Sequence, residues 1–335
     1  MGFPGHVLGA PKIERVRVRF ISDFNTVLAT VLAGEAHVTV DDSIRFQQGA
    51  ILRREWAPRN GGTILTTPDQ WRRSEFQLRS EFTNPRSLLD VRVRRALAHA
   101  VDKNGINDAL FEGEGILAET FIPPTVDFYA TVDRLIRKYP LDLRQTEQLM
   151  VEAGFAKGGD GSWVQPAEGR FSGEIKVNQS AQSEAEMAIM AEGFRRAGFE
   201  FREVPVPQAQ SRSGELRGSF PSLYTGGGGT GDASLPSFLS ANIPRAENRW
   251  VGNNRSGYNN PDFDRLIDAY NSTLERDKRN EQFAQMARLF TDDLPAISLY
   301  FNPGIVAYVS SLEGPVPFGP QADVGWNVHE WRWVR

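Results

Sequence analysis

The residues of this chain that could touch a bound molecule are concentrated in a glycine-rich stretch, Phe220–Phe238. Tyr224, Thr225 and Gly226 lead into a run of glycines, and Asp232 follows it. Glycine has no side chain, so the backbone there can approach a bound molecule closely. The run is not a phosphate-binding loop, because no lysine closes it. It predicts either a ligand-contacting loop or a flexible surface loop.

A second candidate set lies in the polar loop that contains Trp250, Asn253 and Arg255. Tryptophan supplies apolar area with one hydrogen-bond donor, and the planar fork of arginine suits a carboxylate. The same side chains could instead brace the loop against neighbouring structure. The pattern therefore predicts either a ligand contact or a structural brace.

The cysteine and histidine content of the chain argues against metal binding and thiol chemistry. The chain has no cysteine, which excludes disulfides, thiol catalysis and cysteine-bound metals. The histidines lie without the spacing of a metal site, and each suits a structural role. They are His6, His37, His99 and His329. We therefore predict no bound metal and no cofactor.

Paired carboxylates could serve as a general acid and base. Asp41 and Asp42 are adjacent, but they are better suited to cap a helix over 43–48. An enzyme built on Asp232 with Asp264 would need a nucleophile, a base and an orienting group, and no such set is evident. The sequence therefore predicts that the chain is not an enzyme.

Length and charge limit the classes of partner. The chain has 335 residues, enough for two domains, and 40% of them are hydrophobic. A net charge of −4 provides no basic face for nucleic acid. No apolar run approaches the roughly 20 residues that cross a bilayer. Residues 1–6 lack the charged start and apolar centre of a secretion signal.

The elements that position these residues centre on Leu89–Leu110, which predicts two short helices in series. Asp90 and Asp102 can cap them by accepting hydrogen bonds from free backbone N–H groups. Val93 and Leu97 recur at helical spacing and mark the apolar face of the first helix. The charged positions off this face are expected to be solvated: Arg92, Arg94 and Arg95.

Two strand–helix–strand patterns indicate an α/β protein. Near the N-terminus, strands at 13–21 and 36–40 flank a helix that begins after Asp23. Farther on, strands at 174–178 and 199–206 flank a helix over 184–197, whose Met and Phe positions face inward. A single connecting helix favours parallel pairing of the two strands in the first pattern.

The run Asp90–Lys103 resembles the "D-x-R-V-R-x-A-L-x-x-A-[IVL]-D-[RK]" signature of one class of extracellular solute-binding proteins. This is the dipeptide/oligopeptide/nickel class, family 5, which serves ABC importers. Tyr258–Ile267 is similar to its "Y-x-N-P-x-F-D-x-L-[IL]" run, and Asp292–Tyr300 to its "E-x-P-x-I-P-L-Y" return strand. The motifs occur here in the same order as in the family.

The resemblance implies an α/β fold with periplasmic-binding-protein-like (type II) lobes. Residues 85–293 would form one large, complete lobe. Residues 1–84 and 294–335 would form the C-terminal part of a second lobe, because family members usually begin with a long segment that has no counterpart here. The hinges would lie at 79–84 and 294–299.

The resemblance also implies a function: the substrate-binding component of an ABC-type importer. It would capture a peptide or similar small solute in an inter-lobe cleft and deliver it to permease subunits in the membrane. In the family, a loop after a strand lines this cleft and its carboxylate can pair with a ligand ammonium group. Asp232 is the counterpart, although the tryptophan of the family loop is absent.

As a family member, the chain would be a periplasmic or extracytoplasmic monomer, either free or anchored to the membrane as a lipoprotein. Alternatives are a non-transport ligand-binding or interaction module and a truncated, non-functional paralogue. An enzyme that uses Asp232 and Asp264 is the weakest alternative. The sequence does not identify the ligand.

Overall fold

A computed structural model describes residues 12–40, 43–316 and 324–334. The contacts divide the chain into two compact units. Unit 1 consists of Met1–Gln70 with Asn302–Arg335, and unit 2 is Trp71–Phe301. The elements that lie wholly in unit 1 are α1 (Phe24–Leu32), α2 (Phe46–Trp56), η1 (Ala57–Arg59), β10 (Leu312–Glu313), η6 (Val324–Glu330) and β11 (Arg332–Trp333).

The main sheet is mixed and six-stranded, with the order β2-β9-β1-β8-β6-β7. β1 and β8 run antiparallel, whereas β6 runs parallel to both β8 and β7. Its strands are β1 (Gly62–Phe76), β2 (Ile116–Leu117), β6 (Ser172–Asn178), β7 (Glu200–Val206), β8 (Leu223–Gly228) and β9 (Ala296–Val309). A small antiparallel sheet contains β3 (Ala156–Lys157), β4 (Trp163–Gln165) and β5 (Gly169–Arg170).

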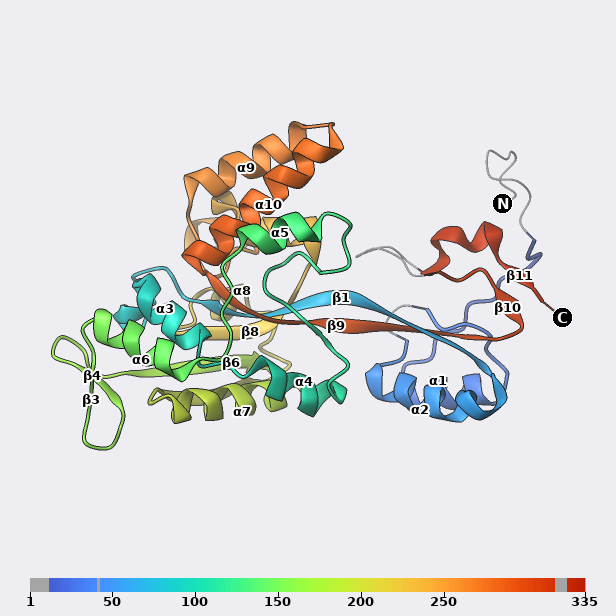
Figure 1. The fold of residues 1–335 in the computed structure, drawn as a ribbon, viewed down its shortest axis with the longest axis horizontal. Coiled ribbons are helices and arrows are strands. Elements are labelled where there is room, and N and C mark those ends of the chain that lie inside the picture. The colour runs from blue at the N-terminus through green and yellow to red at the C-terminus, as the bar shows by residue number, and fades with distance from the viewer. Residues whose placement is uncertain (1–11, 41–42, 317–323, 335) are drawn as a thin grey trace. The chain divides into compact units, whose positions relative to one another are not determined.

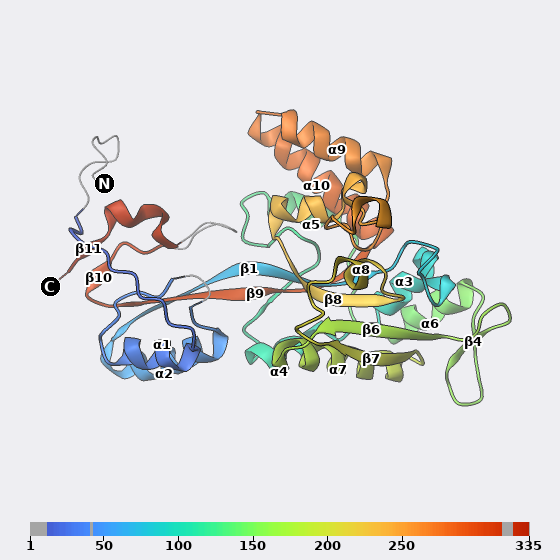
Figure 2. The same cartoon turned by 180° about the vertical axis from the view of Figure 1, so that it is seen from behind.

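Helices cover both sides of the sheet in unit 2, with α7 on one side and α5, α9 and α10 on the other (Figures 1 and 2). This arrangement confirms the predicted α/β class. The α-helices are α3 (Val91–Ala98), α4 (Lys103–Phe111), α5 (Tyr129–Leu135), α6 (Leu143–Glu152), α7 (Ala181–Arg196), α8 (Gly214–Gly218), α9 (Pro261–Ser272) and α10 (Arg276–Asp293). Short 3-10 turns are η2 (Arg86–Leu89), η3 (Gly231–Ser237), η4 (Ser240–Asn242) and η5 (Ala246–Asn248).

The core of unit 2 forms around Trp71, which is fully buried in β1. Its indole contacts the rings of Phe121, Phe238 and Phe290 at centroid distances of 6.0, 5.9 and 5.5 Å. Because Phe290 belongs to α10, this aromatic cluster attaches that helix to the sheet. The pairs with Phe121 and Phe290 are edge-to-face, and such pairs add stabilisation beyond the area that they bury.

The second predicted strand–helix–strand unit is confirmed by β6, α7 and β7. Its strands pair in parallel, and α7 packs against both. Met187, Met190 and Phe194 are buried on the inner side of α7, as their spacing predicts. On β6, Ile175 and Val177 are fully buried while the residues between them are partly exposed. Alternation on the strand and helical spacing on α7 therefore build one shared core layer.

The two short helices expected around Leu89–Leu110 are present as α3 and α4. The carboxylate of Asp90 accepts a hydrogen bond from the backbone N–H of Arg92 at 2.8 Å. That of Asp102 accepts one from Gly105 at 2.8 Å. Both caps were predictable because their donors lie within the next helical turn.

The predicted solvated position of Arg94 is wrong, because this side chain is 7% exposed. Its guanidinium donates hydrogen bonds to the backbone oxygens of Leu88, Leu89, Asp293 and Leu294 at 2.6–3.1 Å. The last two carbonyls end α10, where backbone acceptors lack helical partners. Burial lowers the pKa of Arg94 to about 10, and the carboxylate of Asp293 opposes this shift. Arg94 therefore joins α3 to the end of α10.

The first predicted strand–helix–strand unit is only partly correct. α1 forms with Asp23 as its cap, but residues 13–21 are irregular, and 36–40 contribute only an isolated bridge between Val38 and Tyr308. Val16, Val18 and Phe20 are 59–96% exposed. Alternation alone does not make a strand, because the ladder bonds come from a neighbouring strand. The predicted Asp41 and Asp42 cap lies outside the described residues.

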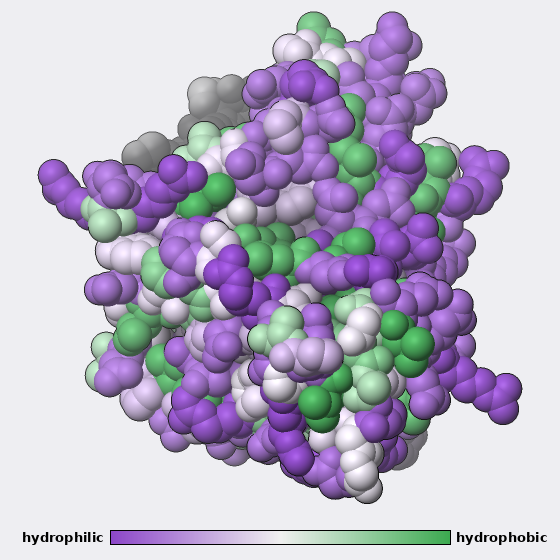
Figure 3. All heavy atoms as spheres, turned by 90° about the vertical axis from the view of Figure 1, so that its left-hand side faces the viewer, coloured by the Kyte–Doolittle hydropathy of each residue, from purple (hydrophilic) through white to green (hydrophobic). Residues whose placement is uncertain are grey.

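Figure 3 views unit 2 from the end that carries α3 and α6. This surface is mostly hydrophilic, and its apolar side chains lie in small separate groups. Single exposed apolar residues are ordinary on a folded surface and do not by themselves indicate a binding site. The exposed apolar residues of η2, α6 and the segment before α6 include Leu89, Leu141, Leu143 and Val151.

Candidate ligand-binding face of the central sheet

Strands β1 and β8 place several of the candidate residues side by side. In their antiparallel register, Glu75 lies opposite Tyr224 and Arg73 lies opposite Gly226. Directly opposed residues project to the same side of a sheet. We call this side the site face. At Gly226 an added Cβ would meet no atom within 4 Å, so the glycine leaves open space beside these polar side chains.

Arg73 and Glu75 form a buried ion pair on the site face. Nε of Arg73 donates to Oε1 of Glu75 at 2.9 Å, and both side chains are less than 10% exposed. The guanidinium also lies over the ring of Trp71 at 4.6 Å and that of Phe238 at 5.5 Å. Gly228 makes this position possible, because a Cβ there would lie 2.0 Å from Nη1 of Arg73. This Nη1 is buried and has no acceptor among the described residues.

Two further arginines interact electrostatically with the same group of side chains. Arg217 comes from α8 and Arg255 from the following polar loop. Burial lowers the pKa of Arg255, and the charges of Arg217 and Arg73 lower it further, while Glu75 opposes them. Within the described chain, neither the Arg217 nor the Arg255 guanidinium has a hydrogen-bond acceptor or an ion-pair partner, and Nε of Arg217 is fully buried. The site face therefore carries more positive charge than its single buried glutamate balances.

Tyr224 completes this face on β8. Its hydroxyl donates to Oδ1 of Asn178 at 2.6 Å, which joins β8 to the end of β6. Burial raises the pKa of Tyr224, and the neighbouring arginines counteract part of that effect. On β6, Glu174 forms ion pairs with both Lys176, at 3.6 Å, and Arg202. This neighbouring strand therefore adds no negative charge that would balance the arginines.

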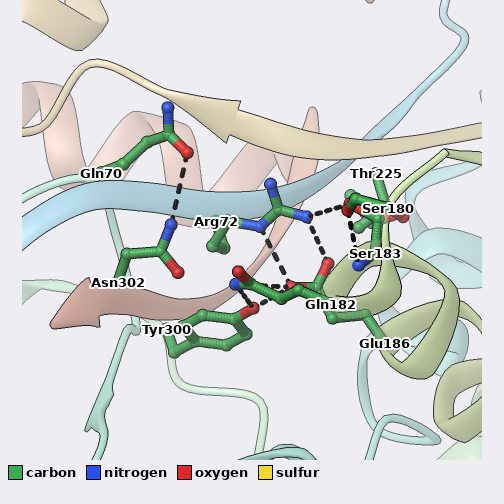
Figure 4. A network of polar contacts seen from close by, with 10 residues as sticks. Gln70, Arg72, Ser180, Gln182, Ser183, Glu186, Thr225, Tyr300 and Asn302 are labelled. Atoms are coloured by element: carbon green, nitrogen blue, oxygen red, sulfur yellow. Dashed lines mark hydrogen bonds and ion pairs between the residues drawn. The ribbon is translucent and has the colours of Figure 1, made fainter. Parts of the chain in front are cut away.

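The opposite side of the sheet is occupied by a closed polar network (Figure 4). Nε of Arg72 donates to Oε1 of Glu186 at 3.1 Å, and Nη2 donates to Oγ of Ser183 at 3.2 Å. The hydroxyl of Tyr300 also donates to Glu186. Burial raises the pKa of Glu186, and Arg72 opposes that shift. This network attaches α7 to β1 and β9 behind the site face.

Thr225 belongs to this opposite side, not to the site face. Its hydroxyl donates to Oγ of Ser74 at 2.8 Å, and it is 1% exposed. Alternation along β8 explains the difference, because Thr225 lies between Tyr224 and Gly226. The structure therefore separates Thr225 from its two neighbours in the predicted set.

Trp250 acts as a brace for the helix that carries Arg217. An added Cβ on Gly214 or Gly218 of α8 would lie 2.7–3.2 Å from Trp250, so helix and tryptophan are in close contact. Its ring also lies 6.1 Å from that of Phe82. The backbone of Trp250 adopts the left-handed region with φ 59°, which is uncommon for a bulky residue.

Trp250 also borders a cavity of about 670 Å³ on unit 2, together with Arg79, Glu81, Arg245 and Glu247. Two arginines and two glutamates balance in charge there. We favour the site face because its arginines outnumber its single buried glutamate.

Asp232 and Asn253 are exposed. Asp232 lies in the first turn of η3, and the carboxylate of Asp264 accepts the backbone N–H of Ser240 at 3.1 Å. That hydrogen bond gives Asp264 a structural role in joining α9 to η4. No group of three or more potential metal ligands occurs among the described residues, and no helix there is long and apolar enough to span a membrane.

Sequence reasoning missed Arg73, Glu75 and Arg217. The alternation of β1 was a usable signal for the first two, because it places them on the same face as Trp71. No local pattern marks Arg217, which reaches this face only through the packing of α8. Tyr224, Gly226 and Arg255 were among the predicted residues and do lie at the site face.

Comparison with known proteins shows the family of this chain. The family model described as bacterial extracellular solute-binding proteins, family 5 Middle, matches residues 4–245. The chain is 28% identical over 244 residues to heme-binding protein A of Haemophilus influenzae, which covers 71% of this chain and 42% of that protein. It is also 28% identical over 221 residues to the dipeptide-binding protein of Escherichia coli. That alignment covers 64% of this chain and 39% of that protein.

Solved structures show the same fold. The oligopeptide-binding protein of Thermus thermophilus, complexed with a pentapeptide, has a TM-score of 0.70 at 26% identity, covering 94% of this chain and 56% of that one. HbpA2 of Haemophilus parasuis has a TM-score of 0.74 at 22% identity. The match covers 93% of this chain and 57% of that one. The chain therefore spans about half the length of proteins that it resembles.

Proposed function

This chain belongs to the family 5 bacterial extracellular solute-binding proteins, and we propose that it is the substrate-binding component of an ABC-type importer. It holds a peptide or similar small solute and passes it to permease subunits in the membrane. It works outside the cytoplasm, as a monomer, by binding without catalysis. Relatives named for dipeptides, oligopeptides and heme support a binding role.

One observation carries the assignment of the solute to the site face. Open space at Gly226 lies on the same face as Tyr224, Arg73 and Glu75. A ligand site needs a few convergent polar groups on rigid elements, with room for the ligand next to them. Here the polar groups come from β1, β8 and α8, and the network of Arg72 fixes the sheet from behind.

The proposal is tested by thermal unfolding of the full chain with a panel of di- to pentapeptides, heme and metal–amino acid complexes. A solute at 100 times its Kd should stabilise the chain by about 2.7 kcal/mol. For a unit of this size, that corresponds to a rise in Tm of about 5–10 °C. Product analysis of each mixture should show unchanged solute.

A matched pair of variants locates the site. Gly226→Leu fills the open space on the site face, whereas Gly159→Leu adds the same side chain in open space in the β3–β4 turn. We expect only Gly226→Leu to lose the stabilisation by solute. The proposal is wrong if no solute raises the Tm, if a solute is converted, or if both variants respond like the wild type.

A further inference from the structure

The cavity of about 670 Å³ that Trp250 borders is distinct from the open space on the site face. It lies beyond Phe76, the last residue of β1, whereas Gly226 pairs with Arg73 inside that strand. Neither Gly226 nor Tyr224 is among its lining residues. Its volume falls within the range of roughly 300–1,000 Å³ that is typical of small-molecule sites. The cavity is therefore large enough to be a site of its own.

A buried arginine fixes two aromatic rings beside this cavity. Arg79 is 8% exposed, and its guanidinium lies over the ring of Phe82 at 4.7 Å and that of Trp250 at 5.8 Å. Nη1 of Arg79 donates to the carbonyl of Pro244 at 2.6 Å. Gly257 makes room for this side chain, because a Cβ there would lie 2.3 Å from Cγ of Arg79. Both rings line the cavity and are only partly buried, so apolar ring surface remains available there.

The backbone that carries one of these rings is strained. Arg249 and Trp250 both adopt the left-handed region, with φ of 57° and 59°, and neither is a glycine. Such a conformation persists only where the surrounding structure enforces it, and it is concentrated at ligand clamps and active sites. The contact with α8 holds one side of the Trp250 indole, and another part of it borders the cavity. A brace alone gives no reason for leaving that part open.

The remaining charged residues of the cavity are exposed and unpaired. Glu81, Arg245 and Glu247 line it, and none of them forms an ion pair with another residue of the described chain. Burial lowers the pKa of Arg79, Glu81 opposes that shift, and Arg245 adds to it. Together with Arg79, these side chains give the lining two positive and two negative charges. A ligand with one charge of each sign suits this lining better than a simple anion or cation.

A neighbouring cavity of about 420 Å³ shows the contrast. It shares Leu78 with the first cavity, but its charged groups are already bonded. The carboxylate of Asp293 accepts from the hydroxyl of Tyr258 and the amide of Asn260, both at 2.6 Å, and Arg94 donates to four carbonyls. Those groups hold the fold together, whereas the exposed charges of the larger cavity remain available to a ligand.

From these features we propose that the larger cavity is a second binding site, which takes a free aromatic amino acid in its zwitterionic form. Arg245 would hold the carboxylate with its planar fork. The carboxylate of Glu81 or Glu247 would accept hydrogen bonds from the ammonium group. The aromatic side chain would pack against the rings of Phe82 and Trp250. This site goes beyond the proposed function and does not rest on it.

An ordinary solvated surface explains only part of this arrangement. Exposed charges without partners are common on proteins and need no ligand. Here, however, they surround a cavity that also has two partly open aromatic rings, a buried arginine that fixes the rings and a strained backbone. Convergent polar groups beside apolar surface on a rigid frame are the usual composition of a ligand site.

The test is calorimetry on the full chain at pH 7 with four probes. L-Phenylalanine carries both charges and the ring. Phenethylamine lacks the carboxylate, 3-phenylpropionate lacks the ammonium group, and L-alanine lacks the ring. We expect L-phenylalanine to bind about 10-fold more tightly than each of the others, as loss of one charged hydrogen bond or of one buried ring predicts. Equal binding of the four probes, or no binding of L-phenylalanine, would overturn the proposal.

Variants at exposed positions assign the binding to the cavity. Arg245→Gln should weaken L-phenylalanine about 10-fold and leave phenethylamine unchanged. The double variant Glu81→Gln/Glu247→Gln should weaken L-phenylalanine but not 3-phenylpropionate. Arg249→Gln is the matched control, because Arg249 is exposed and does not line the cavity. All of these variants should melt at the wild-type temperature, since the replaced side chains are exposed.

The solute site is distinguished by Gly226→Leu, which should bind L-phenylalanine like the wild type. If Gly226→Leu abolishes this binding while Arg245→Gln keeps it, L-phenylalanine occupies the site face, so the second site is wrong and the proposed function stands. If Arg249→Gln weakens binding as much as Arg245→Gln, the effect is one of general charge and the second site is again wrong. If the expected pattern appears although no transport solute raises the Tm, the second site stands and the proposed function fails.

Discussion

Replacing Gly228 by alanine tests the geometry of the site face most directly. The new Cβ would lie 2.0 Å from Nη1 of Arg73, so the guanidinium must move. It is held on its other sides by Glu75 and by the ring of Trp71 at 4.6 Å. Removing one partner of a buried ion pair costs about 3–5 kcal/mol. Because Arg73 can keep part of its contact with Glu75, we expect a loss of about 2–3 kcal/mol, below that range.

The control is Gly226→Ala, two residues earlier on the same strand and face. Its Cβ meets open space, so the free energy of unfolding should change by less than about 0.5 kcal/mol. Thermal unfolding followed by far-UV circular dichroism should place Gly228→Ala about 4–10 °C below Gly226→Ala. Equal melting temperatures would show that Arg73 is not packed against Gly228, and the described site face would be incorrect.

Two other regions of unit 2 give further predictions. Arg94→Met should lower the free energy of unfolding, measured in urea, by about 3 kcal/mol, because four carbonyls lose a charged donor. Arg95→Met should lower it by only about 1 kcal/mol, because Arg95 donates one hydrogen bond, to the Asp292 carbonyl at 2.7 Å. Equal losses would contradict the role assigned to Arg94. Burial raises the pKa of Tyr139 to about 12, above its unfolded value near 10, so its stabilising contribution is complete below pH 10 and disappears towards pH 12. The wild type should therefore lose about 2 kcal/mol relative to Tyr139→Phe between these pH values, and parallel pH profiles would contradict this.

Local signals in the sequence predicted most of the fold. Asp90 and Asp102 cap helices through donors only two or three residues away, so residue type and position sufficed. The predicted exposure of Arg94 was wrong because its burial depends on residues that are distant in the sequence. Two of its acceptors lie about 200 residues later, at the end of α10, and no pattern near Arg94 indicates them. The strand expected at 13–21 failed similarly, because alternation cannot supply a partner strand.

The site shows the same division between local and distant information. Tyr224 and Gly226 were identified because glycines after an apolar strand form a local pattern. Thr225 was included with them, although alternation along a strand turns every second residue away. Arg217 has no local signal at all, since only the packing of α8 brings it near Tyr224 and Arg255. Charge partners across elements are what a single sequence leaves undetermined.

The way unit 2 distributes its charges gives the strongest reason to place the ligand on the site face. On the α7 side, Arg72 and Glu186 are buried together and satisfy each other, so that side is complete without a ligand. On the site face, burial lowers the pKa of Arg255 and Nε of Arg217 is buried, and neither side chain has a partner within the described chain. Local rules of folding are broken most often where a site is built for a partner.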